Sequence, residues 1–185
     1  MAVARPLRRV RVWSRTRANA EAFRAEALKR HSCPISVCET PEAALAGADL
    51  ICTVTGSREP VVHRPWLTAG AHLNLVGSSV AAAREADSDT VAAALVYCDR
   101  RESLLAESGD FLIPKAEGRF GDDHLVGELG DLLEGKVPGR RSPTDLTLFK
   151  SLGLAIEDLA SAHLVARRAL AQGIGTVIEI GGLRH

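Results

Sequence analysis

The sequence predicts an α/β protein built around a parallel β-sheet, and two observations carry this prediction. Short apolar, β-prone runs alternate along the 185-residue chain with segments of helical periodicity. The runs are nearly continuous in their apolar character, which is typical of strands buried on both faces of a parallel sheet. Glycine and polar residues bound the runs and mark the turns between elements.

The first strand and helix lie between residues 10 and 28. Val10 and Val12 share one face of a predicted strand that ends at Trp13. Thr16 is a suitable N-cap for the helix that follows. Arg15 is thereby left at the carboxyl end of a strand, where open parallel sheets bind ligands. Apolar residues then recur with helical spacing: Ala20, Phe23, Ala27 and Leu28.

Two interpretations of Arg15 are open at this point. In a dinucleotide-binding fold, the end of the second strand contacts the adenosine ribose: an acidic residue there selects NAD, and an arginine accommodates the 2′-phosphate of NADP. The segment Ser14-Arg15-Thr16 matches the NADP choice. The alternative is an ordinary capped turn with a solvated arginine.

The remaining elements continue the alternation of strand and helix. Further strands are predicted over residues 35–38, 50–54, 71–76, 95–98, 146–149 and 176–180, with short helices over 41–46 and 127–134. Residues 109–123 carry Pro114, Gly118 and Gly121 and are predicted to be loop-rich, so they could form a flexible flap. From Leu152 the pattern predicts a helix of about five turns that Gly173 ends.

Polar residues gather where several predicted strands end. Thr53 and Thr55 follow one strand, Gly77-Ser78-Ser79 follow the next, and Asp99-Arg100-Arg101 follow a third. Because carboxyl ends of parallel strands meet at one edge, this edge is the predicted site.

A mononucleotide-binding unit begins with a strand, a glycine-rich turn and a helix whose N-terminus meets the pyrophosphate. No glycine of this chain forms a G-x-G-x-x-G after a strand, and only nine residues precede Val10. With the usual strand order, the absent strand would lie between those at Val10 and Leu50. Two unpaired edges would then favour self-association or poor folding. The alternative is a smaller sheet that never had this strand.

Composition excludes several other classes of function. The chain has 23 basic and 23 acidic residues, and its formal net charge is zero. The charge therefore gives no indication of a nucleic acid or an anionic membrane as partner. No apolar run approaches the roughly 18 residues of a membrane span, and the N-terminus does not resemble a signal peptide. We therefore expect a cytoplasmic protein. The four cysteines form no C-x-x-C pair, and adjacent Asp122, Asp123 and His124 cannot converge on one ion, so no metal is expected.

Several runs together resemble the ornithine cyclodeaminase and mu-crystallin family: VRVWSRTRANAEAF, ADLICTVTGSREPVV, AGAHLNLVGSSVAAAREADSDTV, VYCDRRESLLAESGDFLIP, GELGDLLEGKVPGR, DLTLFKSLGLAIEDLASA and ALAQGIGTVIEIGG. The resemblance implies a Rossmann domain that binds NAD(P) and a second domain that binds substrate and forms a homodimer. Residues 1–152 would be a partial Rossmann domain without its first strand and glycine-rich turn. Residues 153–185 would be a helix and strand that pack on the absent second domain.

The resemblance also implies roles for individual residues. Cofactor contacts are implied at Ser14, Arg15, Thr16, Thr53, Val54, Thr55, Val76, Gly77, Ser78 and Ser151, with the first three at the ribose phosphate as in NADPH-binding members and Val76 to Ser78 near the nicotinamide. Glu107 corresponds to a substrate-facing position. Simpler interpretations stay open, namely strand-end hydroxyls for the threonines, turn geometry for Gly77 and a solvated helix residue for Glu107.

One departure from the family pattern bears on the reaction. Where true cyclodeaminases place a catalytic aspartate, this chain has Ser79, whose hydroxyl cannot accept an amine proton near neutral pH. This favours an imine reductase or amino-acid dehydrogenase branch that uses NADPH on a cyclic imino acid such as pyrroline-2-carboxylate. The alternatives are a non-catalytic module that binds NADPH and a small ligand, and an inactive truncated gene product. By itself the chain is expected to be inactive.

Overall fold

The computed structural model describes residues 4–178 and 181. The chain divides into two compact units, residues 1–152 and 153–185, and each is described by itself. The strands of the first unit are β1 (Val10–Val12), β2 (Ile35–Val37), β3 (Leu50–Thr53), β4 (His72–Leu75), β5 (Ala94–Cys98), β6 (Leu125–Glu128) and β7 (Leu146–Lys150). Its α-helices are α1 (Arg17–Ala27), α2 (Pro41–Leu45), α3 (Ser88–Ala92), α4 (Arg101–Glu107), α5 (Gly109–Ala116) and α6 (Leu129–Leu133). Single 3-10 turns are found at Arg64–Trp66 and Asp122–His124.

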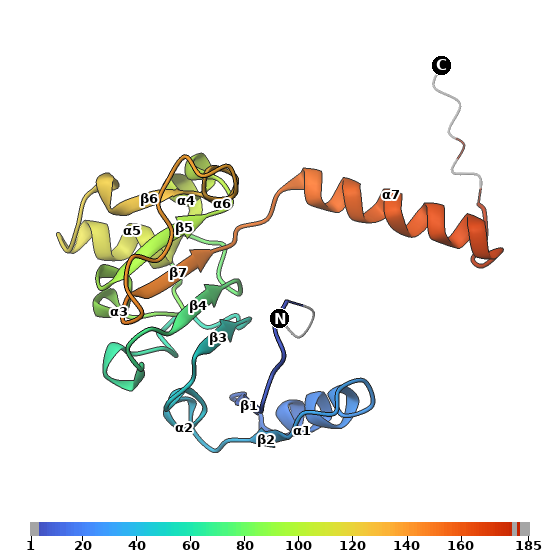
Figure 1. The fold of residues 1–185 in the computed structure, drawn as a ribbon, viewed down its shortest axis with the longest axis horizontal. Coiled ribbons are helices and arrows are strands. Elements are labelled where there is room, and N and C mark those ends of the chain that lie inside the picture. Colours follow the sequence, from blue (N-terminus) through green and yellow to red (C-terminus); the bar gives the residue numbers. More distant parts are fainter. Residues whose placement is uncertain (1–3, 179–180, 182–185) are drawn as a thin grey trace. The chain divides into compact units, whose positions relative to one another are not determined.

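All strand pairs in these two sheets are parallel, which confirms the predicted α/β class. One sheet contains β1 and β2, and the other has the order β3-β4-β7-β5-β6 (Figure 1). The last strand in sequence, β7, therefore lies in the middle of the larger sheet and pairs with both β4 and β5. This central position brings Lys150, at the end of β7, between the ends of two neighbouring strands.

One face of the larger sheet holds the core of the protein. Leu73, Leu75 and Leu148 on this face are at most 1% exposed. They belong to one apolar cluster with Val91 of α3, Leu104 of α4 and Phe111 of α5. The opposite face is less well covered near β3 and β4: Cys52 is exposed, and His72, Asn74 and Phe149 are only half-buried.

The helices that precede and follow β2 begin in different ways. Pro41 starts α2, and the Thr40 hydroxyl accepts a hydrogen bond from the amide of Ala43 at 3.1 Å, which is a regular N-cap. Thr16 occupies the N-cap position of α1 as predicted, but its side chain makes no capping hydrogen bond. The Thr16 hydroxyl therefore does not stabilise the start of α1.

The prediction that residues 109–123 form a loop-rich flap is wrong. Residues 109–116 form α5, in which Asp110, Phe111 and Pro114 are buried. A Cβ atom at Gly109 would lie 2.1 Å from the carbonyl oxygen of Ala83, so only glycine lets this helix approach the preceding loop so closely. The sequence signal was misleading because the glycine serves close packing and the proline is tolerated within this short helix.

Two further boundaries differ from the predictions. The helix predicted over residues 127–134 is in fact strand β6 (Leu125–Glu128) followed directly by α6 (Leu129–Leu133). The strand predicted over residues 176–180 is not found at residues 176–178, and residues 179 and 180 lie outside the described part. An isolated β-prone segment has no ladder partner here, and strand formation depends on that pairing.

The second unit contains α7 (Ala155–Gln172), which has the predicted length of five turns. Gly173 ends the helix in the left-handed conformation, with φ of 63°, as expected for a glycine at this position. Within the described residues, no helix combines the length and the apolar character that crossing a membrane requires.

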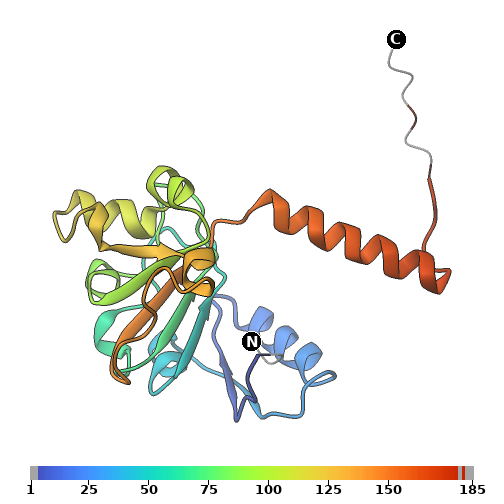
Figure 2. The ribbon, with the colours of Figure 1, turned by 45° about the horizontal axis from the view of Figure 1, so that its top comes forward.

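Strands β1 and β3 do not pair with each other. Each pairs on one side only, β1 with β2 and β3 with β4. A cavity of about 1460 Å³ lies between them and is lined by residues of both strands. In Figures 1 and 2 the β1-β2 pair is separated from the larger sheet on the side of β3. This is the position at which the sequence predicts an absent strand.

Candidate functional site

The candidate site lies at the carboxyl ends of β3, β4 and β7, which are neighbours in the larger sheet. Residues 53–55 come at the end of β3, residues 76–78 follow β4, and Ser151 follows β7. The amide of Ser151 donates to the Leu75 carbonyl at 3.0 Å and the amide of Val76 donates to the Thr53 carbonyl at 3.0 Å. The structure therefore brings these three predicted segments together.

A residue that sequence reasoning missed, Glu85, joins two of these segments. One of its carboxylate oxygens accepts from the Thr55 amide and hydroxyl, each at 2.7 Å. The other accepts from the Thr53 hydroxyl at 2.6 Å and from the Gly77 amide at 2.8 Å. The side chain is completely buried. Glu85 thus fixes the ends of β3 and β4 relative to each other. This gives the hydroxyl groups of Thr53 and Thr55 a structural role.

Gly77 is required by this arrangement. A Cβ atom at this position would lie 2.2 Å from the backbone nitrogen and oxygen of Thr55 and 2.5 Å from the Glu85 carboxylate. No flexible side chain could move aside to make room, because the closest atoms belong to the backbone. The glycine therefore serves the close approach of two strand ends.

A buried ion pair lies beneath the same strand ends. The Lys150 ammonium is 3.2 Å from a carboxylate oxygen of Asp110, and both side chains are at most 3% exposed. Lys150 also donates to the Ser78 carbonyl. The other oxygen of Asp110 accepts from the amides of Glu85 and Ala86 at 2.8 and 3.1 Å. The pair thus ties α5 and the loop bearing Glu85 to the turn after β4.

Burial sets the direction of the Asp110 pKa. Removal of the carboxyl from water raises this pKa above its ordinary value, and the positive charge of Lys150 and the two amide hydrogen bonds only partly oppose that effect. Glu85 adds a second buried carboxyl next to this pair. The region therefore holds two acidic groups and one base, and the hydrogen-bond donors around Glu85 compensate for its charge.

Ser151 contacts a further buried acid at the sheet edge. Its hydroxyl donates to the carboxylate of Asp99 at 3.4 Å, and the same oxygen accepts from the Leu152 amide at 2.6 Å. The other oxygen of Asp99 accepts from the Arg100 amide at 2.8 Å. Asp99 thus fixes the path of the chain where β7 ends, which is consistent with its predicted place at this edge.

The predicted ribose-phosphate segment lies on the other side of the cavity. Ser14, Arg15 and Thr16 follow β1, and Arg15 is exposed. The exposed Val54 and the half-buried Thr55 line the cavity from the side of β3, as Trp13 does from the side of β1. The two parts of the predicted cofactor site therefore flank the gap between the sheets, and residues 4–178 place no strand between them.

Glu107, the predicted substrate-facing residue, ends α4 and is exposed. Two residues later, Gly109 packs against the carbonyls of Ala81 and Ala83 in the loop that follows Ser78. Glu107 therefore lies at the end of α4, two residues before the start of the helix that meets this loop. Its side chain is solvated in the structure, so its role toward substrate stays a prediction.

Three of the buried charged residues, namely Glu85, Asp110 and Lys150, were not singled out from the sequence. Lys150 carried a usable signal, because a lysine that ends the apolar run LTLF needs a carboxylate partner if the strand is buried. Glu85 and Asp110 gave no such signal. They lie in segments rich in polar and small residues, where an acid is ordinarily solvated.

The site fits part of a dinucleotide. Nucleotides bind at the carboxyl ends of the strands in open parallel sheets, and Val54 and Val76 are exposed at this edge. The exposed guanidinium of Arg15 suits a phosphate. The sequence contains no glycine-rich pyrophosphate turn after a strand. The residues present therefore fit the two ends of such a cofactor rather than its middle.

Fold and site together define an α/β protein of the Rossmann class. The model of the "Ornithine cyclodeaminase/mu-crystallin family" matches residues 1–173, and the chain belongs to this family. The chain is 41% identical over 156 residues to ketimine reductase mu-crystallin of Mus musculus, and the aligned residues cover 84% of this chain and 46% of that protein. It is 35% identical over 176 residues to a Delta(1)-pyrroline-2-carboxylate reductase of Bacillus cereus, covering 95% and 54%.

A solved structure shows the same fold. Delta(1)-pyrroline-2-carboxylate reductase of Thermococcus litoralis, in complex with NADH and L-proline, matches with a TM-score of 0.90 and 37% identity, covering 96% of this chain and 55% of that one. The chain spans about half the length of the relatives that it matches. The activity of a whole family member is therefore a proposal for this chain.

Proposed function

We propose that this chain is the NADP-binding part of an imine-reducing oxidoreductase that acts on a cyclic imino acid such as pyrroline-2-carboxylate. The observation that carries the proposal is the assembly of strand ends at one edge, where Glu85 fixes Thr53, Thr55 and Gly77. A precisely fixed edge of this kind suits a nicotinamide that must present one face to a substrate. Relatives named as reductases of small imino acids support it.

Each group has a distinct part in this proposal. Val76, Gly77 and Ser78 lie near the nicotinamide, and Ser14, Arg15 and Thr16 hold the adenosine ribose phosphate. Further contacts along the cofactor come from Thr53, Val54, Thr55 and Ser151. The cofactor, when bound, supplies the hydride. Ser79, which is exposed beside the turn after β4, offers no carboxylate to accept the proton of an amine, in keeping with reduction rather than cyclodeamination. Glu107 faces the substrate, and a homodimer completes the enzyme.

Arg15→Ala is expected to weaken binding of NADPH about tenfold to a hundredfold and to leave NADH nearly unchanged. The reason is loss of a charge-assisted contact to the 2′-phosphate, worth about 1.5 to 3 kcal/mol. Calorimetric titration of both cofactors measures the effect. Arg30→Ala, which removes another exposed arginine, beyond the carboxyl end of α1 and thus at the opposite end of this helix from Arg15, is the matched control. An equal loss for NADPH and NADH would contradict the assignment of Arg15.

By itself, this chain is expected to give no turnover. Hydride transfer needs cofactor and imine held in contact, and neither a pyrophosphate turn nor a site for the substrate carboxylate is found in this sequence. The measurement is oxidation of NADPH by the purified chain with pyrroline-2-carboxylate, followed by the absorbance of reduced nicotinamide at about 340 nm. A rate proportional to the amount of chain would refute this expectation.

A further inference from the structure

Two buried groups of opposite charge hold the backbone of the turn after β4. The amide of Gly77 donates to the Glu85 carboxylate at 2.8 Å, and the carbonyl of Ser78 accepts from the Lys150 ammonium. Glu85 is completely buried and Lys150 is 1% exposed. A carboxylate only accepts hydrogen bonds and an ammonium only donates them, so each charge selects a different backbone group. An amide and a carbonyl of this turn are therefore both held toward the interior.

The other half of each of these peptide groups points the opposite way. The described residues contain no cis peptide bond, and in a planar trans peptide group the carbonyl and the amide point in opposite directions. The Val76 carbonyl shares a peptide group with the Gly77 amide and is therefore directed away from Glu85. The Ser79 amide shares one with the Ser78 carbonyl and is directed away from Lys150. The turn thus presents one acceptor and one donor on the side away from the buried charges.

Both of these outward groups are available to a ligand. Val76 is 42% exposed, and Ser79 is exposed as well. Within residues 4–178, no hydrogen bond is found to the Val76 carbonyl or from the Ser79 amide. A carbonyl and an amide at this spacing often bond to each other across a β-turn, but these two do not. Their hydrogen-bonding capacity is therefore unused in the described part of the chain.

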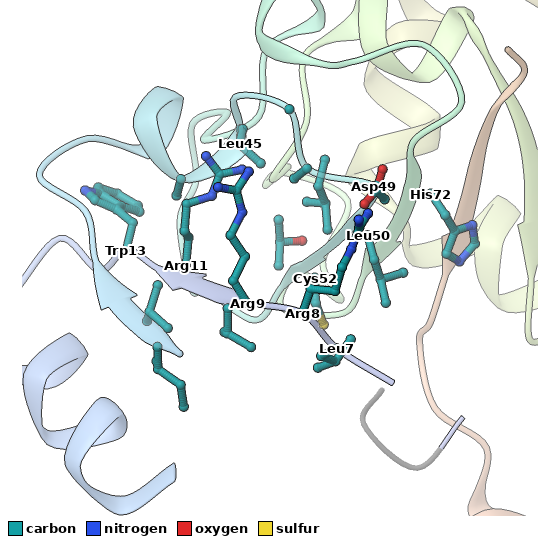
Figure 3. Close-up of a pocket in the computed structure, with 18 of the residues that line it drawn as sticks. Leu7, Arg8, Arg9, Arg11, Trp13, Leu45, Asp49, Leu50, Cys52 and His72 are labelled. Carbon is teal, nitrogen blue, oxygen red and sulfur yellow. The ribbon is translucent and has the colours of Figure 1, made fainter. Parts of the chain in front are cut away.

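The turn lies at the rim of the cavity between β1 and β3. Figure 3 shows Cys52 of β3 in the wall of this cavity, with Trp13 on the side of β1. The lining continues along the chain from Cys52 to Thr55. The backbone of Thr55 is so close to Gly77 that a Cβ atom on the glycine would lie 2.2 Å from it. A ligand at this end of the cavity therefore lies beside the turn.

A primary carboxamide matches the two outward groups. Its oxygen can accept from the Ser79 amide while its NH₂ group donates to the Val76 carbonyl. A carboxylate has no hydrogen for the Val76 carbonyl, and an ammonium has no acceptor for the Ser79 amide. The nicotinamide ring of the proposed cofactor carries such a carboxamide.

We propose that Lys150 is a positioning residue that, together with Glu85, orients the turn after β4 to bind the carboxamide of the nicotinamide through the Val76 carbonyl and the Ser79 amide. Lys150 acts through Ser78 and does not touch the cofactor itself. The inference rests on the proposed function, because that function supplies the nicotinamide. It deepens the proposal by naming the backbone groups that recognise the ring and the buried charges that orient them.

The role of Lys150 follows from what its removal leaves behind. Asp110 lies 3.2 Å from the ammonium and fixes it in place. Without the cation, the Ser78 carbonyl would be buried near two carboxylates, which repel its oxygen, and it would lose its hydrogen bond. Rotation of the peptide group between Ser78 and Ser79 would relieve both effects. The Ser79 amide would then no longer be held outward.

Calorimetric titration of the full chain with three probes tests this inference. The probes are NADP⁺, its analogue with nicotinic acid in place of nicotinamide, and 2′-phospho-ADP-ribose, which lacks the ring. The parent chain is expected to bind NADP⁺ at least about tenfold more tightly than the nicotinic acid analogue, because a carboxylate cannot donate to the Val76 carbonyl. 2′-Phospho-ADP-ribose reports the adenosine end alone.

The variant for this test removes both members of the buried ion pair. Lys150→Met combined with Asp110→Asn leaves no unpaired charge, so it is better tolerated than Lys150→Met alone. Its preference for NADP⁺ over the nicotinic acid analogue is expected to fall below about threefold, with the affinity for 2′-phospho-ADP-ribose unchanged. A loss of fold would weaken all three probes together and leaves no such selective change. Lys115→Met, which removes a surface cation of α5 that pairs with Asp122, should keep the full preference.

Hydrogen exchange measured by NMR on the parent chain tests the orientation without any substitution. The Gly77 amide, which is bonded to Glu85, is expected to exchange slowly, and the Ser79 amide is expected to exchange without protection in the free chain. NADP⁺ should slow exchange at Ser79 by at least about tenfold, whereas 2′-phospho-ADP-ribose should leave it unchanged.

The outcomes separate this inference from the proposed function. Equal affinity of the parent for NADP⁺ and the nicotinic acid analogue, with 2′-phospho-ADP-ribose still bound, would overturn the inference and leave the cofactor in place. A folded double variant that keeps the tenfold preference would show that Lys150 has no positioning role. Protection of the Ser79 amide in the free chain would show that it points inward. If none of the three probes binds, the proposed function itself is contradicted, and the ligand assigned to this turn is withdrawn with it.

Discussion

Lys150→Met is expected to lower the free energy of unfolding by about 3 to 5 kcal/mol, because it leaves a buried carboxylate without its cation. The Lys150 ammonium lies 3.2 Å from Asp110, and both side chains are almost fully buried. It also donates to the Ser78 carbonyl, so the turn after β4 loses a hydrogen bond as well. This loss is a large part of the roughly 5 to 15 kcal/mol by which domains are stable.

The destabilisation in this variant should depend on pH. Burial already raises the pKa of Asp110, and Lys150 is the largest effect that lowers it, so removal of Lys150 raises the pKa further. Between the pKa of the unfolded chain and that of the folded variant, the folded state binds more protons. The free energy of unfolding must then fall as the pH rises through this window. Lys150→Met should therefore be least damaging near pH 4 and most damaging at neutral pH.

Urea denaturation at several pH values measures both effects. Lys136→Met is the matched control, because Lys136 pairs with Asp131 and Glu134 at the surface, where an ion pair contributes little. The double variant with Asp110→Asn should recover part of the loss, since removal of both charges leaves none unpaired. A Lys150→Met protein as stable as the parent at neutral pH would show that this ion pair does not stabilise the fold.

Glu85→Ala is expected to cost on the order of 4 kcal/mol and to loosen the carboxyl edge of the sheet. The carboxylate accepts four hydrogen bonds, from two hydroxyls and two amides of Thr53, Thr55 and Gly77. Each buried donor left without a partner costs about 1 to 3 kcal/mol, reduced where a hydroxyl turns or water enters the space. The ends of β3 and β4 then have no common acceptor to fix them.

Glu85→Gln separates the effect of the side chain's hydrogen-bond acceptors from the effect of its size. An amide keeps the size but presents an NH₂ group to at least one of the donors, so a loss of about 1 to 3 kcal/mol is expected. Glu59→Ala, at an exposed glutamate, should change the free energy of unfolding by less than about 0.5 kcal/mol. Chemical denaturation and the amide proton shifts of Thr55 and Gly77 measure the effects. Unchanged shifts for these two amides in Glu85→Ala would rule out Glu85 as the group that fixes both segments.

The sequence by itself determined the class of fold and most of its strands. Apolar runs such as Leu50–Thr53 and Leu146–Lys150 are local patterns, and they persist in the structure because at least one face of each strand is buried. The family followed from the order of several short runs. Local patterns also located the strand ends at Thr53 and Gly77, since polar residues interrupt the apolar runs there.

Only the tertiary structure decided how those strand ends are fixed. Glu85 lies 30 residues from Thr55 along the chain and Asp110 lies 25 residues from Glu85, so no local pattern links them. Residues 109–116 form a helix because Gly109 and Phe111 pack against distant parts of the chain, although their composition is that of a loop. The unpaired edges of β1 and β3 are likewise a property of the assembled sheets. A strand requires hydrogen-bonding partners that are distant in sequence, and such partners become visible only when the chain is folded.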